Sequence, residues 1–304
     1  MMALPWNSPL LFPKWVWVTM GSLANFGLRS GVDSKHRQFV DEFFRVHSTY
    51  WRDVYQADTL SALIYRERQA VVLRMIDSLQ IPEGARLLDI GCGAGLTAVA
   101  LARRKFMVTA ADSVEDMLDL TSQAAAEAGV SQSVKPCLAD VCELRFPSDS
   151  FDAVVAMGVL PWVDCPQNAI SEIHRVLRPG GHVVMTADNS WCLNQILDPL
   201  CFPGLRPLRW RIGEMLEKLK VRRPSRPRLH RHSIKYINGL IRQVGFHILA
   251  SKTLGFGPFT FFKQELFPES ISIKIHLQLQ NLADYKVRRL GSLGTEYVVL
   301  ARKN

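Results

Sequence analysis

Short apolar strands alternate with helices between residues 86 and 187, and this alternation limits the fold more than any other feature of the chain. The segments between the strands have helical spacing; one helix begins at Pro166 and another ends at Gly129. Strands that alternate with helices of about 10–15 residues are typical of a parallel sheet covered on both faces. The predicted fold class is therefore α/β, with a doubly wound, mostly parallel sheet. Its strands are predicted over 86–90, 108–111, 134–139, 151–157 and 182–187.

Two helical segments precede this alternation. Apolar residues recur at helical spacing over 39–55. A second helix is predicted to begin near Asp58 or Thr59, because either residue is a good N-cap. A turn over 82–84 (PEG) ends this helical lead-in. We therefore expect a helical cover on the N-terminal side of the sheet.

After the fifth strand the regular rhythm breaks. It returns at Ser233, the predicted N-cap of a helix over 234–244 that ends at Gly245. A strand over 246–255, a loop-rich region and a strand over 296–302 follow. Nothing in the break has the pattern of an independent core, so a single domain with a large insertion is predicted.

The positive charge of the chain is concentrated in that insertion. The formal net charge is +9, and residues 201–235 alone hold 11 Lys/Arg against Glu214 and Glu217, which accounts for the whole excess. A uniformly high pI would indicate a nucleic-acid or membrane partner, but here the excess marks one local element. A helical piece around 208–220 has an apolar face. It is interpreted either as a membrane-surface helix or as a solvated cover over an apolar substrate pocket.

The first 28 residues are apolar and contain Trp6, Trp15 and Trp17. Lys14 is their only charge, so the basic start of a secretory signal is missing. Prolines interrupt the run of about 20 apolar residues that a membrane span needs. Two interpretations follow: an arm that packs onto the domain, or an interfacial contact with a membrane. The six cysteines form no C-x-x-C pair and are predicted to be reduced thiols in a cytoplasmic protein.

A glycine-rich turn follows the first strand and carries the clearest chemical signal. Residues 91–95 (GCGAG) have the spacing G-x-G-x-G, whereas the dinucleotide fingerprint is G-x-G-x-x-G. Glycines at such a turn let the backbone approach a ligand and direct amide N–H groups toward it. The preceding Asp89 would repel a pyrophosphate but can pair with an ammonium group. The predicted ligand is therefore nucleoside-like with a positive amino end.

Two further carboxylates end the next strands. Asp112 follows the second strand at about the spacing of a ribose-binding acid, and a carboxylate can accept from both ribose hydroxyls. Asp140 ends the third strand, where it can accept from an adenine amine. A single acid at a strand end is commonly a turn residue. Three acids beside a glycine-rich turn predict one crevice at the carboxyl edge of the sheet.

These segments resemble the class I S-adenosylmethionine-dependent methyltransferases of the small-molecule type. The resemblance implies a Rossmann-like methyltransferase sheet, an enzyme, and S-adenosylmethionine as its cofactor. It also implies that the strands over 246–255 and 296–302 form the closing antiparallel hairpin of that fold. The matching segments are LLDIGCGAG (87–95), VTAAD (108–112), LAD (138–140), FDAVVAMGVLPWV (151–163) and RVLRPGGHVVMT (175–186).

The resemblance also assigns the cofactor-binding residues. The first acid and the glycine-rich turn, residues 89–95, would bind the methionine end, and Asp112 would bind the ribose. Residues 113, 117, 140 and 141 would contact the adenine. Residues 157 and 160 would line the methyl-transfer crevice. Tyr50 and Tyr55 of the helical cover are candidate lid contacts, or else pack within the cover. The assigned residues are Asp89, Gly91, Cys92, Gly93, Gly95, Asp112, Ser113, Met117, Asp140, Val141, Met157 and Leu160.

With this resemblance the chain divides into five parts. Residues 1–34 are an apolar N-terminal arm, and residues 35–304 a single methyltransferase domain. The predicted parts of that domain are a helical cover over 35–80, a cofactor-binding core over 81–188, a basic insertion over 189–232, and a closing helix and hairpin over 233–304.

Methyl transfer from a sulfonium needs few catalytic groups, because positioning supplies about 7–11 kcal/mol at best. An oxygen nucleophile would also need a base, for which histidine is the usual choice. No catalytic residue is selected, and His174 is expected to be structural. No metal is predicted, because His230 and His232 lack a third ligand. The other candidate bases are His36, His47, His230 and His232.

The predicted function is methyl transfer to the oxygen or carbon of a small, lipophilic acceptor, quinol- or lipid-like. One alternative is an RNA methyltransferase that uses the basic stretch, but residues 157–162 (MGVLPW) lack the (Asp/Asn)-Pro-Pro-aromatic motif of amino methylation. Another is a cofactor-binding protein without activity, which the intact Asp89 and Asp112 disfavour. The predicted partners are the acceptor and, through arm and insertion, a membrane surface; the oligomeric state is not predicted.

Overall fold

The computed structural model describes residues 33–205, 208–209, 211–212, 215, 227–285, 287 and 289–304. The predicted apolar arm, except for its last two residues, and most of the predicted basic helix lie outside this set. Among the described residues, no helix has the length and hydropathy needed to cross a membrane. The six cysteines all lie in the described part and are free thiols, as predicted.

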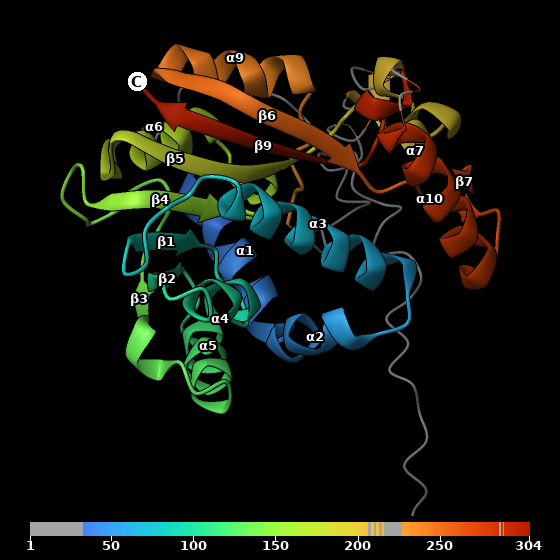
Figure 1. Ribbon diagram of the computed structural model, residues 1–304. Helices are drawn as coiled ribbons and strands as arrows, with labels where there is room; N and C mark the ends of the chain where they lie inside the picture. Colours follow the sequence, from blue (N-terminus) through green and yellow to red (C-terminus); the bar gives the residue numbers. More distant parts are fainter. Residues whose placement is uncertain are drawn as a thin grey trace, which may run out of the picture.

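Seven strands form one sheet in the order β3-β2-β1-β4-β5-β9-β6 (Figure 1). The first five strands along the chain run parallel, whereas β9 lies antiparallel between β5 and β6. This arrangement confirms the predicted doubly wound sheet and its closing antiparallel hairpin. The bounds are β1 Arg86–Ile90, β2 Met107–Asp112, β3 Val134–Leu138, β4 Phe151–Ala156, β5 Leu177–Asp188, β6 Phe246–Leu254 and β9 Glu296–Lys303.

The register of the central strands brings the predicted cofactor residues to one edge. Ile90 pairs with Ala111, and Asp112 pairs with Leu138. The N–H groups of Gly91 and the following residue both donate to the Ala111 carbonyl, at 2.8 and 3.1 Å. The carboxyl ends of β1, β2 and β3 therefore meet, and the order of strands reverses between β1 and β4, where a crevice is expected.

Helices cover both faces of the sheet. Because successive strand side chains point to opposite faces, Leu87 joins the core under one helical layer and Leu88 the core under the other. The first layer consists of α3 (Leu60–Asp77), α4 (Leu96–Ala102) and α5 (Glu115–Glu127). The second consists of α6 (Pro166–Val176) and α9 (Ile234–Val244).

Helix ends follow the predicted capping residues. Thr59 Oγ1 accepts a hydrogen bond from the Ala62 amide at 3.2 Å, which caps α3. Ser233 Oγ accepts from the Tyr236 amide at 3.2 Å at the start of α9. Gly245 ends α9 with a φ of +109°, a value that favours glycine. These local signals confirm the predicted start of α3 and both ends of α9.

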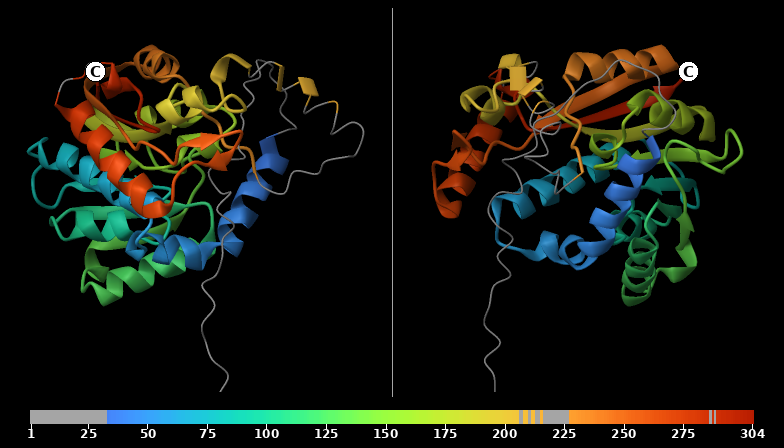
Figure 2. Two further views of the ribbon diagram at one scale, coloured as in Figure 1. Left: turned by 90° about the vertical axis from the view of Figure 1, so that its right-hand side faces the viewer. Right: turned by 180° about the vertical axis from the view of Figure 1, so that it is seen from behind.

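The segment predicted as loop-rich contains a helix, α10 (Glu269–Asp284), so that prediction was wrong. Its buried residues, Ser272, His276 and Gln280, are polar, which hides the apolar period. His276 Nδ1 accepts from the Phe256 amide at 3.1 Å, and Gln280 accepts from the Gly255 amide at 3.1 Å. The helix thus satisfies backbone donors after β6, and it packs beside α3 (Figure 2).

Two other boundaries differ from the prediction. The N-terminal cover is not one continuous pattern, because the helix breaks at His47. Strand β5 begins at Leu177 rather than at residue 182. Phe151 of β4 pairs with Leu177, and the register then shifts, so that residues 178–181 form a bulge before the regular pairing resumes. The cover consists of α1 (Asp33–Val46), α2 (Ser48–Asp53) and η1 (Val54–Gln56).

The remaining elements are short. They are η2 (Ser131–Ser133), η3 (Leu160–Trp162), α7 (Leu193–Leu197), η4 (Pro203–Leu205), β7 (Thr260–Phe261), β8 (Gln264–Glu265) and η5 (Leu290–Ser292).

Candidate active site

A cavity of about 570 Å³ lies at the carboxyl edge of β1, β2 and β4, and residues of the N-terminal cover line part of it. It brings together most of the residues predicted to bind the cofactor. Asp89, Gly95 and Leu160 are the predicted residues that do not line it. Those that line it are Gly91, Cys92, Gly93, Asp112, Ser113, Met117, Asp140, Val141 and Met157.

The glycine-rich turn needs glycine for two different reasons. Gly93 has a φ of +55°, and a Cβ placed there would meet no atom within 4 Å, so its backbone is open to a ligand. Gly95 has a φ of +80° and opens α4. A Cβ there would stand 2.8 Å from the Thr121 Cα. Gly95 therefore shapes the turn against α5 and is not a wall of the cavity.

Asp89 lies behind the glycine-rich turn rather than on the cavity wall. Its side chain is 1% exposed. One carboxylate oxygen, Oδ2, has no hydrogen-bond partner among the described residues. Burial, and then the nearby charge of Asp112, raise the pKa of Asp89 to about 8, against a hydrogen bond from the Ala98 amide that lowers it. A cation placed at this turn would favour the ionised carboxylate.

Asp112 organises the turn and the start of α5. Its Oδ2 accepts from the Gly93 amide at 3.0 Å and its Oδ1 from the Val114 amide at 3.1 Å. Burial raises the pKa of Asp112 even though these amides oppose the shift. Met117, on the buried face of α5, lines the same part of the cavity. A carboxylate that faces the cavity at the end of β2 is placed to accept from paired hydroxyls.

The sequence did not predict that α1 would contact two of these residues. Arg37 Nη1 lies 2.5 Å from Asp140 Oδ2, and Ser113 Oγ donates to Asp41 Oδ1 at 2.7 Å. Burial raises the pKa of Asp41 despite that hydrogen bond. Helical spacing predicts that a helix exists here but not which element it packs against. The two contacts of α1 with Asp140 and Ser113 therefore could not be predicted from the sequence.

Leu160 was predicted to line the methyl-transfer crevice, but the structure does not place it on the cavity wall. Its side chain is fully buried in the core on the α6 and α9 side of the sheet. The residue opens η3, and this short helix turns the preceding and following residues, Val159 and Pro161, toward the cavity instead. Met157 lines the cavity as predicted.

A group of aromatic rings lines a further part of the cavity wall. Trp162 of η3 stacks on Phe43 at 5.9 Å between centroids and meets Phe44 edge-on at 5.0 Å. Trp51 and Tyr65 are 5.9 Å apart and also line the cavity. Of the two predicted lid candidates, Tyr55 lines the cavity and Tyr50 does not. We use the name aromatic wall for five of these residues: Phe43, Phe44, Trp51, Tyr65 and Trp162.

Two buried ion pairs lie on the cavity wall nearest β5 and β9. Arg68 Nη1 is 3.5 Å from Glu296 Oε1, and Arg231 Nε is 3.5 Å from Asp188 Oδ2. Burial and the charge of Glu296 raise the pKa of Asp188 to about 7, although both arginines oppose the shift. The guanidinium of Arg68 also lies over the Tyr65 ring at 4.7 Å. These groups place charge on the cavity wall close to the Tyr65 ring.

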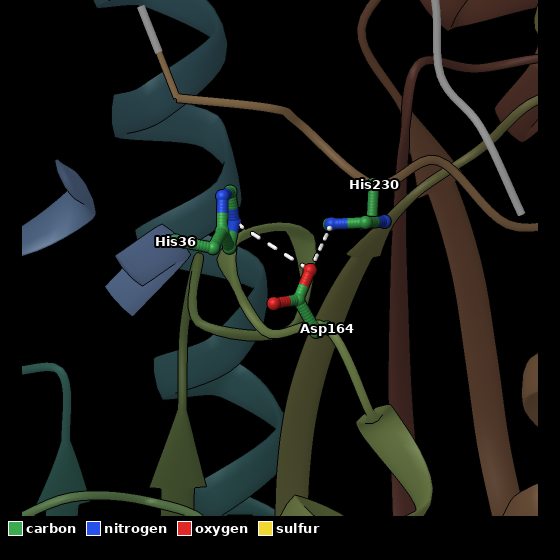
Figure 3. Close-up of side chains that lie close together, drawn as sticks. All are labelled: His36, Asp164 and His230. Atoms are coloured by element: carbon green, nitrogen blue, oxygen red, sulfur yellow. Dashed lines mark ion pairs between the residues drawn. The ribbon is translucent and has the colours of Figure 1, made fainter. Parts of the chain in front are cut away.

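Three side chains from separate elements, two of which line the cavity, converge on one point (Figure 3). Asp164 Oδ1 is 3.0 Å from His230 Nε2 and 3.8 Å from His36 Nε2. His36 belongs to α1, Asp164 to the loop before α6, and His230 to the segment before α9. The His230 amide donates to the Pro161 carbonyl at 2.6 Å, which fixes that segment against η3.

The other candidate histidines do not reach the cavity wall. His47 Nδ1 lies 2.7 Å from the Phe43 carbonyl. The ring of His174 packs edge-on against Phe246 at 4.9 Å, which fits the structural role predicted for it. His232 stacks against Tyr236 at 5.1 Å.

Fold and cavity together define an α/β protein with a nucleoside-type site at the switch point of its sheet. Residues 88–185 match the family described as a methyltransferase domain. The chain therefore contains a class I S-adenosylmethionine-dependent methyltransferase domain.

Curated relatives agree with this domain over part of their length. The 27-O-demethylrifamycin SV methyltransferase of Amycolatopsis mediterranei is 33% identical over 46% of this chain and 50% of its own. A ubiquinone biosynthesis O-methyltransferase of Xanthomonas axonopodis pv. citri is 30% identical over 51% of this chain and 62% of its own. The chain spans about half the length of the curated relatives it matches.

Solved structures share the fold. A magnesium protoporphyrin IX methyltransferase from Synechocystis PCC 6803 has a TM-score of 0.57 at 16% identity, over 88% of this chain and all of that one. The [4+2]-cyclase SpnF has a TM-score of 0.56 at 19% identity, over 87% of this chain and 94% of that one. Since a cyclase shares the fold, the reaction must be argued from the site.

The residues present fit S-adenosylmethionine. A buried carboxylate oxygen of Asp89 has no partner behind the turn, where an ammonium group would stabilise it. Gly93 leaves open space for a ligand, and the carboxylates of Asp112 and Asp140 line the same cavity. These groups would hold the methionine, ribose and adenine ends respectively.

The pKa of Asp89 predicts a pH dependence of cofactor affinity. An ammonium group pairs with the ionised carboxylate, so binding below pH 8 must release the proton that Asp89 holds. We expect the affinity for S-adenosylhomocysteine, measured by calorimetry, to rise by up to about tenfold per unit from pH 6 toward 8. Asp89→Asn should weaken binding and abolish this slope, and a wild-type affinity that is constant over this range contradicts the assignment.

Proposed function

We propose that this protein transfers a methyl group from S-adenosylmethionine to an oxygen or carbon of a small, lipophilic, quinol-like acceptor. The observation that carries the proposal is one continuous cavity, which joins the glycine-rich turn and strand-end carboxylates to the aromatic wall. The cofactor supplies an electrophilic methyl group on a sulfonium. The task of the chain is to hold the acceptor atom in line with that group, and positioning of this kind contributes about 7–11 kcal/mol at best.

The aromatic wall supports a flat, apolar acceptor. Phe43, Phe44 and Trp162 present ring faces and edges from two elements, and a ring that packs among them gains about 0.5–1.5 kcal/mol per aromatic contact beyond its burial. The two relatives described above are named for quinone and rifamycin O-methylation, which also supports an oxygen acceptor on a ring compound. The buried pairs at Arg68 and Arg231 supply polar groups that can orient such a ring.

The division of the chain that we propose follows from this cavity. The helical cover and the end of the basic insertion both contribute to its wall, through residues such as Phe43 and Arg231. We therefore propose that the cover and the insertion build the acceptor side together with Trp162, and that the strand ends within residues 81–188 build the cofactor side. The arginines among the described residues of the wall are all paired with acids: Arg68 and Arg231 are buried, and the more exposed Arg37 pairs with Asp140. This pairing disfavours a basic groove for a nucleic-acid backbone.

A methyl-transfer assay tests the acceptor class. The full chain is incubated with methyl-labelled S-adenosylmethionine and a cell extract separated into organic, aqueous and RNA fractions. We expect label in the organic fraction, and Trp162→Ala should raise the KM for that acceptor about tenfold while the affinity for S-adenosylhomocysteine stays unchanged. Trp191→Ala is the matched control, because Trp191 is 47% exposed and off the cavity wall. Label confined to RNA, or none at all, contradicts the proposal.

We propose in addition that the enzyme works in the cytoplasm at a membrane surface, where a lipophilic acceptor is concentrated. Exposed apolar side chains of the described part of the insertion, Leu208, Ile212 and Met215, support this, as does the charge of residues 201–235. In the same assay, acceptor presented in anionic vesicles should be methylated faster than acceptor in neutral vesicles. Equal rates would remove the membrane role and leave methyl transfer intact.

A further inference from the structure

We infer that His36, Asp164 and His230 form a binding site for one divalent transition-metal cation such as Zn²⁺, at the edge of the acceptor cavity. The three donor atoms, His36 Nε2, Asp164 Oδ1 and His230 Nε2, all lie within 4.8 Å of one another (Figure 3). They come from α1, the loop before α6 and the segment before α9. No local sequence motif joins them, so the chain must fold to assemble the set.

The distances suit a small cation. Zinc binds imidazole nitrogen and carboxylate oxygen at about 2.0–2.2 Å, which places tetrahedral ligand atoms about 3.3 Å apart. The two separations from Asp164 Oδ1, 3.0 and 3.8 Å, bracket that value. Two imidazoles and one carboxylate are also a donor set that divalent zinc, iron and cobalt accept. Shifts of less than about 1 Å would therefore complete the coordination.

The direction of the donor atoms favours a cation over a proton relay. In a catalytic His–Asp pair, the carboxylate orients one ring nitrogen while the other faces the substrate. Here both histidines direct Nε2 at the same carboxylate oxygen, and both Nε2 atoms are shielded from solvent without a hydrogen bond of acceptable geometry in the described part of the chain. Two imidazoles that share one acceptor atom are explained by an ion between the three groups.

The site is closed on the protein side and open to the cavity. The side chains of His36 and His230 are 13% and 12% exposed, and that of Asp164 is 31% exposed. His36 and Asp164 line the cavity together with Trp162. Three protein ligands leave at least one coordination position free, which is the pattern of catalytic rather than structural zinc.

The use of the cation rests on the proposed function, although the site does not. A hydroxyl oxygen of the acceptor that took the free position would lose its proton to solvent more readily, because a bound divalent cation lowers the pKa of a coordinated oxygen. The oxygen then forms its bond to the methyl carbon as the carbon–sulfur bond breaks, and the sulfonium becomes a neutral thioether. The bound cation would thus activate the acceptor hydroxyl, a role for which the sequence indicated several candidate histidine bases without selecting one.

Cobalt and zinc titrations of the chelator-treated full chain test the site without any methyl transfer. We expect one equivalent of Co²⁺ to give visible d–d absorption, and Zn²⁺ to displace it. His36→Ala and His230→Ala should each weaken binding about 100-fold or more, since loss of even an outer partner costs 10–100-fold. Asp164→Asn, which conserves volume, covers the case in which a histidine variant does not fold.

Two controls separate the outcomes. His47→Ala removes a histidine at the end of the same helix whose ring does not face the cluster, so cation binding should be unchanged. Binding of S-adenosylhomocysteine to every variant reports an intact cofactor cavity, and its absence from the wild type would sink the proposed function while the cation titration still stood. Absence of stoichiometric cation binding, or binding unaffected by all three substitutions, overturns the site.

Discussion

Asp112→Ala is expected to lower the affinity for S-adenosylhomocysteine at least about 100-fold. A hydrogen bond to a charged group contributes about 1.5–3 kcal/mol, and the carboxylate is placed to accept from two ribose hydroxyls. The substitution also releases the Gly93 amide, which Asp112 Oδ2 holds at 3.0 Å, and so loosens the turn that receives the methionine end. Calorimetric titration of the purified full chain measures the change directly.

The matched control for this prediction is Asp116→Ala. Asp116 is an exposed acid on the first turn of α5 and does not line the cavity. Its substitution by alanine therefore removes one negative charge from the same region and leaves the cavity wall intact. Asp112→Asn should give an intermediate loss, because an amide oxygen still accepts one hydrogen bond. Unchanged affinity in Asp112→Ala would show that the ribose is not held at the end of β2, and the cofactor assignment would fail.

Arg68→Met is expected to reduce stability by about 3–5 kcal/mol, the usual cost of removing one partner of a buried ion pair. Arg68 is 7% exposed and Glu296 is 3% exposed, and Glu296 Oε2 already has no hydrogen-bond partner among the described residues. Without the guanidinium the carboxylate would be buried beside Asp188, whose charge repels it. For a chain of this size the melting temperature should fall by about 10 °C.

A double variant distinguishes pairing from simple loss of packing. Arg68→Met with Glu296→Gln removes both charges, and we expect it to recover most of the lost melting temperature, because buried pairs are often replaceable by neutral groups. Arg45→Met breaks an exposed pair with Glu42 at 2.7 Å and should leave the melting temperature unchanged. If the double variant melts as low as Arg68→Met, the loss comes from packing around Tyr65 rather than from the charge.

The sheet and the cofactor side could be predicted from sequence because their signals are local. Strand β1 was predicted with its observed bounds, and the glycine-rich turn, Asp112 and Asp140 follow successive strands whose ends must meet in a parallel sheet. Thr59 and Ser233 cap helices through their own side chains, which needs no tertiary contact. Such features are encoded within a few residues of where they act.

The acceptor side could not be predicted in the same way because it depends on contacts between distant segments. His36 and His230 lie on different elements, and the sequence does not show that both are close to Asp164 in the fold. The role of either histidine therefore could not be predicted from the sequence. Helix α10 was missed because its buried face is polar and serves backbone donors elsewhere. Leu160 was misassigned because the tightness of η3 determines which neighbouring side chains face the cavity.

The contacts of α1 have a kinetic consequence. Arg37 already holds Asp140, and Asp41 already holds Ser113, the two groups assigned to adenine. A nucleoside that binds to those groups must first displace the α1 side chains from them. Cofactor binding therefore breaks these two contacts, and cofactor release allows them to form again. The same helix carries Phe43 toward the acceptor. We therefore expect the release of spent cofactor to require movement of α1, and so to depend on whether the acceptor side is filled.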